Sequence, residues 1–264
     1  MTEKAQAGNS INKALDIIED LGEHGASSLA DMNLRLGLDK GTLHRILKIL
    51  RERGFVDQSP SDRRYFNTIR MFQIGSREVE RGGLKTLARP YLEKMAAAFG
   101  ETIHVAILVD PGKAVCVDKM EAAPGPQVRL NMSLGSEVSL YASSMGKCLL
   151  AFSSEERLKA ILPKIKYEKF SSTTIRGTVA FKKELARVRS QGYAVDDGET
   201  MESIFCIGTP ILNHRAEAYA AISVTGPKTR MLAKKDAVIR MLKEISKELS
   251  IHYGLPANKW PLDN

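Results

Sequence analysis

The stretch that decides how the N-terminal part of the chain folds is residues 27–66, SSLADMNLRLGLDKGTLHRILKILRERGFVDQSPSDRRYF. Its opening serines can cap a first helix, which carries apolar residues at helical spacing and ends at Gly37. Asp39 can cap a second helix, which Gly54 ends. Two helices joined by a short glycine-containing turn form a supersecondary unit that is typical of DNA-binding proteins.

The second helix, expected at residues 40–53, has two chemically different faces. Apolar residues recur every three or four positions and predict a buried face: Leu43, Ile46, Leu47 and Leu50. The opposite face carries donors that can reach phosphates and base edges in a major groove: Lys40, Thr42, His44, Arg45 and Lys48. The polar face of a surface helix more often meets only water, so further features are needed to favour DNA.

Two such features are a ribbon after the helix and a local excess of positive charge. A strand is expected to begin at Phe55, and the Ser-Pro-Ser-Asp run at 59–62 supplies turn residues. Arg63 and Arg64 then fall at the tip of a wing. Over residues 35–70, nine basic residues against four acidic ones leave +5, the excess that a phosphate-facing surface needs.

The composition of the whole chain is that of a globular protein. Its 264 residues are 43% hydrophobic and 27% charged, with a net charge of +8, which suits one large or two smaller domains. No run of eighteen apolar residues occurs, and residues 1–10 lack a signal-peptide core, so we expect a cytoplasmic protein. Because Cys116, Cys148 and Cys206 are far apart, we expect buried thiols, and no metal, cofactor or disulfide.

The N-terminal domain is expected to span residues 10–67. Residues 1–9 look disordered, and Ser10 is expected to cap a helix. Its apolar stripe completes a three-helix core: Ile11, Leu15, Ile18 and Leu21. Residues 68–83, TIRMFQIGSREVERGG, are charged and moderately amphipathic and end in two glycines. We predict that they form a linker helix, which could pair with its copy in a dimer.

Residues 84–254 show a mixed pattern that predicts one mostly antiparallel sheet with helices packed on it, an α+β fold. Strands are expected at 103–109, 114–119, 127–131, 138–141, 193–195, 204–210 and 218–225. Helices are expected at 89–99, with Pro90 in the first turn, and at 232–253. Three more are expected at 144–151 with the cap Ser143, at 154–162 with the cap Ser153, and at 179–189 with the cap Thr178.

Seven blocks along the chain resemble the IclR family of bacterial transcriptional regulators. They are SINKALDIIEDL (10–21), LADMNLRLGLDKGTLHRILKILRERGF (29–55), ETIHVAIL (101–108), SSMGKCLLAF (143–152), VRSQGYAVDDGE (188–199), CIGTPI (206–211) and AISVTGP (221–227). The resemblance covers about residues 10–254, and several weak blocks in the family's order are more specific than any one of them.

The resemblance implies a winged helix-turn-helix joined by a linker helix to an effector-binding domain with a GAF-like or PAS-like fold. Family members bind operator DNA as dimers or dimers of dimers and respond to small organic acids and related metabolites. We therefore expect a transcriptional regulator of a catabolic or metabolic operon. Its expected partners are double-stranded DNA, an aliphatic or aromatic carboxylate, and further copies of itself. The sequence leaves open the effector, the operator and the choice between activation and repression.

The sequence departs from the family pattern at three places. Asn33 replaces a small residue, usually alanine, in the first helix of the motif. Gly41 replaces a serine or threonine, which removes a DNA-contacting hydroxyl and loosens the second helix by about 1 kcal/mol relative to alanine. Residues 66–68 replace the usual leucine-glycine after Tyr65. These differences bear on the operator sequence rather than on DNA binding itself.

The resemblance also implies which positions line the effector pocket: Ser144, Met145, Gly146, Asp196, Cys206, Ser223 and Thr225. Their chemistry agrees, because N–H groups at a helix start attract a carboxylate and hydroxyls two residues apart on a strand share a face. Asp196 could accept a hydrogen bond from a ligand hydroxyl. His104 and Arg129 are further candidates because they are polar residues in apolar strands, although a structural hydrogen bond would explain them equally well.

A serine hydrolase is the alternative reading. Ser144 and Lys147 match S-x-x-K, in which a lysine activates a serine. No S-D-N or K-T-G partner follows, and no nearby histidine would activate Cys206, so we do not expect an enzyme. A third class, an interaction module that does not bind DNA, is disfavoured by the local charge of +5.

Overall fold

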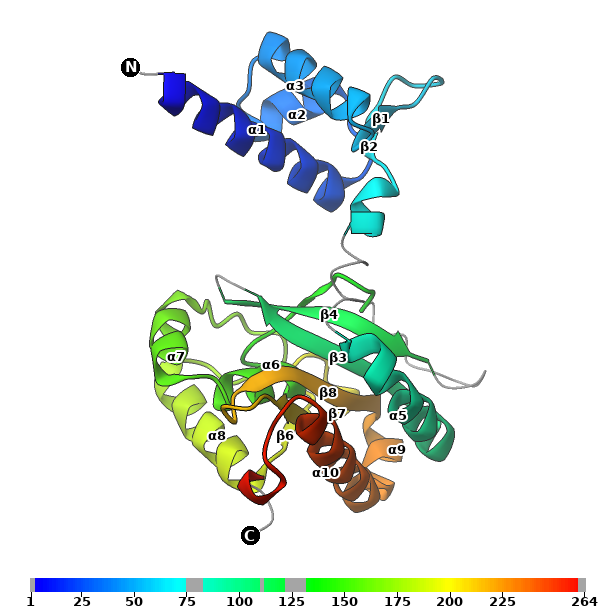
Figure 1. The fold of residues 1–264 in the computed structure, drawn as a ribbon, viewed down its shortest axis with the longest axis vertical. Coiled ribbons are helices and arrows are strands. Elements are labelled where there is room, and N and C mark those ends of the chain that lie inside the picture. The colour runs from blue at the N-terminus through cyan, green and yellow to red at the C-terminus, as the bar shows by residue number, and fades with distance from the viewer. Residues whose placement is uncertain (1–2, 75–82, 110–111, 122–131, 261–264) are drawn as a thin grey trace. The chain divides into compact units, whose positions relative to one another are not determined.

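The computed structural model describes residues 3–74, 83–109, 112–121 and 132–260. The chain divides into two compact units, Met1–Gly82 and Gly83–Asn264 (Figure 1), and each is described by itself. Among the described residues, no helix has both the length and the apolar character needed to cross a bilayer.

The N-terminal unit is a winged helix-turn-helix, as predicted. It consists of α1 (Glu3–His24), α2 (Leu29–Leu36), α3 (Lys40–Glu52) and an antiparallel ribbon of β1 (Val56–Gln58) and β2 (Tyr65–Asn67). Residues 70–74 are helical. The rest of the expected linker helix up to residue 82 lies outside the described residues.

The first helix differs from its prediction at both its start and its buried face. It begins at Glu3, so Ser10 lies inside the helix and the expected disorder was wrong for residues 3–9; residues 1–2 lie outside the described residues. Residues 3–7 are good helix formers. Ile11 and Leu15 are 62% and 52% exposed, whereas Ile17 is fully buried. The buried stripe is rotated because the helix also turns a carboxylate inward, as described next.

A buried ion pair joins α1 to α2. The guanidinium of Arg35 donates from Nε and Nη2 to the two carboxylate oxygens of Asp20 at 2.6 and 2.7 Å, and Nη2 also donates to Ser27 Oγ at 2.8 Å. The Asp20 side chain is only 4% exposed. Because both carboxylate oxygens are paired, the charge can be buried and fixes how the two helices cross.

The ends of α2 and α3 follow the predicted local chemistry. Ser28 caps α2 in a reciprocal capping box with Asp31, and Gly37 ends it at φ 64°. Asp39 caps α3 by accepting the backbone N–H of Thr42 at 2.9 Å. The predicted inner face of α3 is buried in full: Leu43, Ile46, Leu47 and Leu50.

The C-terminal unit contains one sheet with the strand order β5-β4-β3-β8-β7-β6, and every pair is antiparallel. This confirms the predicted mostly antiparallel sheet. The strands are β3 (Thr102–Val109), β4 (Lys113–Met120), β5 (Glu137–Val138), β6 (Ala194–Asp197), β7 (Ile204–Leu212) and β8 (Ala218–Pro227).

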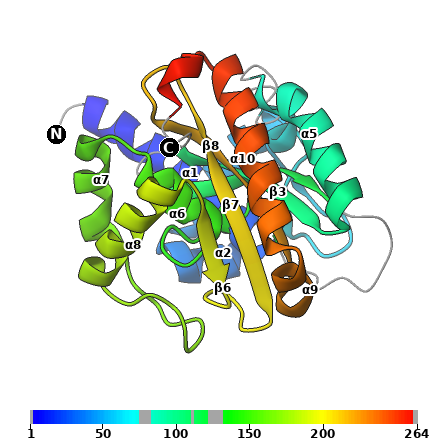
Figure 2. The same ribbon diagram turned by 90° about the horizontal axis from the view of Figure 1, so that it is seen from below.

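Helices cover both faces of this sheet (Figure 2). One face packs against α5 (Leu84–Phe99), α9 (Lys228–Ala233) and α10 (Lys235–His252). The other face packs against α6 (Ser144–Ala151), α7 (Glu155–Ile161) and α8 (Thr178–Gln191). All eight residues of α6 are buried, so this helix is the centre of the second layer.

Several expected boundaries in this unit were wrong. Helix α5 begins at Leu84, which leaves Pro90 inside it. Burying Leu84 contributes about 1.5 to 3 kcal/mol, which offsets the cost of about 3 kcal/mol for an interior proline. The expected closing helix is two helices that meet at Lys234. The strand expected at 127–131 lies outside the described residues.

Two helix caps also differ from the expected ones, and one strand is shorter. Ser154, not Ser153, caps α7, because the Ser153 hydroxyl donates to Leu149 O at 2.7 Å. Gly177, not Thr178, precedes α8. The strand expected at 138–141 is only Glu137–Val138, since the chain turns there to enter α6.

Candidate DNA-recognition surface and effector pocket

The outward face of α3 is a row of solvent-exposed cations. Lys40, His44, Arg45 and Lys48 are exposed. Within the described part of the chain, no ion pair or hydrogen bond holds the side chain of Lys40 or Arg45. Thr42 differs, because its hydroxyl and backbone N–H bind Asp39 and lower the pKa of that carboxyl. Its hydroxyl is therefore already used in capping the helix.

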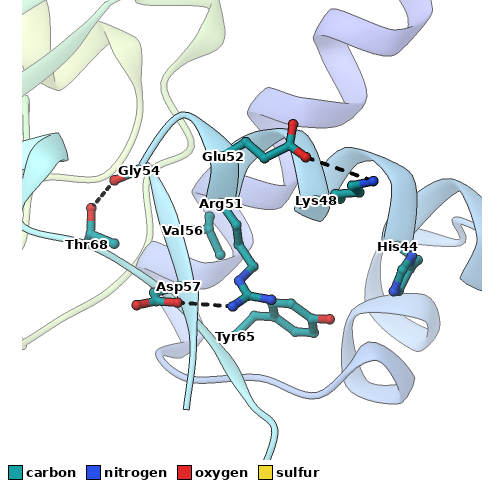
Figure 3. A pocket seen from close by; sticks show the side chains of 9 residues that line it. All are labelled: His44, Lys48, Arg51, Glu52, Gly54, Val56, Asp57, Tyr65 and Thr68. Carbon is teal, nitrogen blue, oxygen red and sulfur yellow. Dashed lines mark hydrogen bonds and ion pairs between the residues drawn. The ribbon is translucent and has the colours of Figure 1, made fainter. Parts of the chain in front are cut away.

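A hollow of about 580 Å³ lies between α3 and the base of the wing (Figure 3). Arg51 reaches across it from α3 to Asp57 on β1, with 3.5 Å between Nη2 and Oδ1. On the helix itself, Lys48 Nζ lies 4.0 Å from Glu52 Oε1. Thr68 and Gly54 also line the hollow, and Thr68 Oγ1 donates to Gly54 O at 2.6 Å. Arg51 was not among the predicted DNA contacts, although it lies one turn beyond Lys48 on the same face.

The two wing arginines have different surroundings. Arg63 occupies the left-handed region at φ 60°, and its side chain has no partner among the residues that the structure describes. Arg64 donates from Nη1 to Ala26 O at 3.2 Å and lies 4.0 Å from Asp62. Arg63 is therefore presented freely at the tip, whereas Arg64 helps to anchor the wing to the body of the unit.

The unusual Asn33 has a structural role inside the helix-turn-helix. Its Nδ2 donates to Leu38 O at 2.7 Å, and its backbone oxygen accepts the N–H of Gly37 at 3.0 Å. An alanine at this position could make only the second contact. Asn33 therefore fixes the turn that sets the angle between α2 and α3.

The second candidate site is a pocket of about 270 Å³ in the C-terminal unit, beside the start of α6. Six of the residues that the sequence analysis named for the effector line it: Ser144, Met145, Asp196, Cys206, Ser223 and Thr225. Its other lining residues were not predicted: Met132, Ser136, Glu137, Ser139, Ser143, Phe170 and Thr200. Most of these lie in irregular segments, where no periodic pattern marks them.

Strand register explains why the pocket forms here. Two neighbouring rows of side chains cross the face of the sheet below α6: Asp196, Cys206 and Thr225, then Gly208, Ser223 and His104. A Cβ on Gly208 would lie 3.1 Å from Ser144 Oγ. The missing side chain therefore lets the start of α6 approach the sheet directly beside the hydroxyl-bearing strand β8.

The start of α6 provides free backbone donors. Ser143 caps it by accepting the N–H of Gly146 at 2.9 Å, whereas the N–H groups of Ser144 and Met145 have no acceptor within the described chain. Both residues line the pocket. Gly146 itself does not, because it packs against Ser139 and Leu140, where a Cβ would lie 2.2 Å from the carbonyl oxygen of Ser139.

Asp196 connects the pocket to the loop after β6. Its Oδ1 accepts the N–H groups of Glu199 and Thr200 at 2.6 and 3.2 Å, and its Oδ2 accepts the hydroxyl of Thr200 at 2.5 Å. Burial raises the pKa of this carboxyl. A group that binds Asp196 therefore also acts on the conformation of residues 197–200.

A buried lysine lies behind the same loop. Lys147 on α6 is 1% exposed, and its Nζ donates to Val195 O at 2.8 Å and to the Glu199 carboxylate, with Glu184 at 3.7 Å. Burial raises the pKa of Glu199 to about 7. Because this ammonium is held by two carboxylates, it is not a free base for Ser144, which is what S-x-x-K chemistry would require.

Of the two remaining named residues, His104 and Arg129, the structure describes only His104. His104 is fully buried on β3, opposite Ser223, and does not line the pocket. Arg129 falls outside the described residues. Burial raises the pKa of Cys116 to about 11 and that of Cys206 well above its usual value, so these thiols stay protonated. Over the described residues, no group of three His, Cys, Asp or Glu side chains could hold a metal.

Comparisons with known proteins agree with this arrangement. The model for the C-terminal domain of the bacterial transcriptional regulator IclR matches residues 77–251, and the IclR helix-turn-helix model matches residues 10–60. The HTH-type transcriptional regulator BhcR of Paracoccus denitrificans is 32% identical, with 89% of this chain and 85% of that protein aligned. XynR of Escherichia coli is 30% identical, with 94% and 98% aligned.

A solved structure supports the same conclusion for the fold. IclR of Thermotoga maritima is 28% identical, with a TM-score of 0.66 over 92% of this chain and 99% of that chain. The family models together reach both units, and the C-terminal one alone spans more than half of the 264 residues. The chain therefore belongs to the IclR family of bacterial helix-turn-helix transcriptional regulators.

Proposed function

We propose that the chain binds operator DNA through α3 and the wing, and that a small organic acid in the pocket beside α6 controls this binding. The observation that carries the proposal is the pocket itself. Free N–H groups of Ser144 and Met145 and the hydroxyls of Ser223 and Thr225 all face one space of about 270 Å³. N–H groups at a helix start favour an anion, and the hydroxyls can form hydrogen bonds with the polar groups of an acid.

The DNA side of the proposal rests on the exposed cations. We assign base and phosphate contacts to Lys40, His44, Arg45, Lys48 and Arg63, with smaller contributions from Thr42 and Arg64 because these two already have protein partners. A helix that presents unpaired donors along one face suits the major groove. The wing would then contact the neighbouring backbone.

Effector control requires two arrangements of the protein that bind DNA differently. An acid that binds one of them better changes DNA affinity by the same coupling free energy, about 1 to 3 kcal/mol in typical cases. We propose domains at 10–67 and 84–254 joined by a linker helix at 68–83, in a cytoplasmic homodimer or dimer of dimers. The exposed Ile11 and Leu15 on α1 support self-association.

The proposal is tested by measuring DNA and acid binding in one preparation. Fluorescence anisotropy with duplex DNA from upstream of the gene should show binding that weakens as salt rises. A thermal-shift panel of aliphatic and aromatic carboxylates should include acids that raise the melting temperature and change the anisotropy. If the protein bound DNA but responded to no acid, the proposed DNA binding would stand and the proposed acid pocket would be rejected.

A matched pair of serine variants localises the acid site. Ser223→Ala should weaken the acid response several-fold and leave DNA binding without acid intact, because Ser223 lines the pocket. Ser190→Ala, at an exposed position on α8, should change neither. If Ser223→Ala weakened DNA binding and lowered the melting temperature together, its role would be in folding.

A further inference from the structure

The sheet wall of the pocket carries two neighbouring polar side chains that are buried and have no partner in the described part of the chain: Ser223 lines the pocket, and His104 lies directly beside it, behind the lining. His104 on β3 is 0% exposed, and neither ring nitrogen has a hydrogen-bond partner among the described residues. Ser223 Oγ on β8 is also buried and unpartnered. The two residues are directly opposite in the β3–β8 register, so their side chains are neighbours on one face.

Leaving these groups unpaired is costly. A buried polar atom without a partner costs about 1 to 3 kcal/mol, whereas an apolar pair at the same positions would pack at no such cost. On one side of this pair the face is apolar, with Ala106 and Ala221; across β4 the neighbour of His104 is Lys119. An unpaired donor and acceptor beside a pocket point to a ligand that supplies the missing bonds.

The pair of His104 and Ser223 is itself uncharged. Burial, and to a smaller extent Lys119 on the adjacent strand β4, lowers the pKa of His104 to about 4. Lys119 is itself paired with Glu121 at 2.8 Å. A neutral imidazole offers one donor and one acceptor, and a serine hydroxyl offers both. This pair matches a group that donates and accepts, and it offers no positive charge to a second carboxylate.

The register also gives the distance from this wall to the start of α6. Ser144 lies over Gly208, and Gly208, Ser223 and His104 follow one another across three adjacent strands. Two strand spacings of about 4.8 Å put His104 roughly 10 Å from Gly208. Hydrogen bonds of about 2.8 Å at each end leave roughly 4 to 7 Å between the two polar ends of a ligand.

We propose that His104 and Ser223 bind a hydroxyl of the effector, whose carboxylate lies at the start of α6, so that the effector is a hydroxy acid with its hydroxyl several bonds from the carboxylate. His104 is then a specificity-determining residue of the pocket. This inference rests on the proposed function, since it names the class of acid that the same site prefers.

The test compares acids that differ only in that hydroxyl. Isothermal titration calorimetry should show that the full-length protein binds 6-hydroxyhexanoate at least ten-fold more tightly than hexanoate, and 4-hydroxybenzoate more tightly than benzoate. The 2-hydroxy isomer and the dicarboxylate terephthalate should gain nothing over benzoate. In His104→Leu the preference within each pair should fall to within about two-fold, whereas His104→Asn, which keeps a donor and an acceptor, should retain part of it.

Thermal melting of the ligand-free variants separates binding from folding. His104→Leu should melt at the same temperature as the parent protein or higher, because it removes unpaired buried polar atoms. A lower melting temperature, with equal loss of both acids in a pair, would make His104 structural and overturn the proposal. Equal affinity of the parent protein for both acids would overturn it while leaving the acid pocket intact. Binding of no acid by the folded protein would reject the pocket as well.

Discussion

The two functional regions use charged side chains in opposite ways. On α3, Lys40 and Arg45 extend into solvent with no partner in the described chain. Behind the effector pocket, Lys147 is buried and bound to Glu199 and Val195. Exposed charges contribute little to stability and remain available to a partner, whereas a buried ion pair depends on both members. Substitutions should therefore affect binding in the first region and folding in the second.

The largest effect that follows from this comparison is expected at Lys147. Lys147→Met leaves the buried carboxylate of Glu199 without its ammonium partner, whereas the half-buried Glu184 keeps Arg187. The loss should cost about 3 to 5 kcal/mol. Urea unfolding followed by circular dichroism measures the loss. Adding Glu199→Gln should recover part of it; a double variant no more stable than the single one would contradict the role given to this pair.

Two glycine-to-alanine substitutions sharpen the same contrast. At Gly146 the new Cβ would lie 2.2 Å from Ser139 O, and forcing this backbone apart should cost about 3 kcal/mol. At Gly41, exposed on α3, the Cβ would be 3.2 Å from Asp39 Oδ1, which can shift by a few tenths of an ångström and still cap the helix. There the gain in helix propensity of up to about 1 kcal/mol should prevail. Urea unfolding of both variants, read for each unit, tests the opposite signs.

The buried His104 predicts how stability depends on pH. Its pKa falls to about 4 in the folded protein, so between about pH 6.5 and 4 the unfolded chain binds a proton that the native protein does not. Stability due to this group is present above pH 6.5 and is lost as pH falls, by at most about 3 kcal/mol. Denaturant unfolding at pH 7 and pH 5 should show a smaller difference for His104→Leu than for the parent; identical differences would refute the assignment.

Arg45 should show the smallest effect on stability and a clear effect on DNA. Arg45→Ala is expected to weaken binding by about 1 to 3 kcal/mol if the side chain reads a base, and to weaken all sequences alike if it contacts phosphate. Its melting temperature should not change. Arg240→Ala, which removes an exposed charge from α10, is the control in anisotropy titrations. Unchanged affinity in the Arg45 variant would remove this residue from the interface.

Local chemistry predicted the N-terminal unit well. The caps Ser28 and Asp39, the stop at Gly37 and the buried face of α3 depend on residues within one or two turns of each other, so the sequence contains what is needed. The predicted start of α5 was wrong because the burial of Leu84 against a sheet that is distant in sequence outweighs the helix-breaking effect of Pro90. The predicted burial of Ile11 and Leu15 was wrong because Asp20 points inward to pair with Arg35, which lies on another helix.

The pocket was predictable only in part. Ser144, Asp196 and Ser223 came from blocks that resemble a family, and strand alternation supported Ser223 and Thr225. Phe170 and Thr200 reach the pocket from irregular segments, where neither period nor cap marks a position. Glu199 could have been suspected, since a lysine in a helix as apolar as α6 needs a carboxylate, but nothing local says which one.

The wing tip shows a trade between shape and charge. Arg63 holds a left-handed backbone at φ 60°, a conformation that costs a non-glycine residue about 1 to 2 kcal/mol. A glycine there would relax the turn but leave the tip without a guanidinium. The strained backbone at Arg63 therefore accompanies a positively charged side chain at the tip of the wing. Arg63→Gly should give a more stable protein with a lower affinity for DNA.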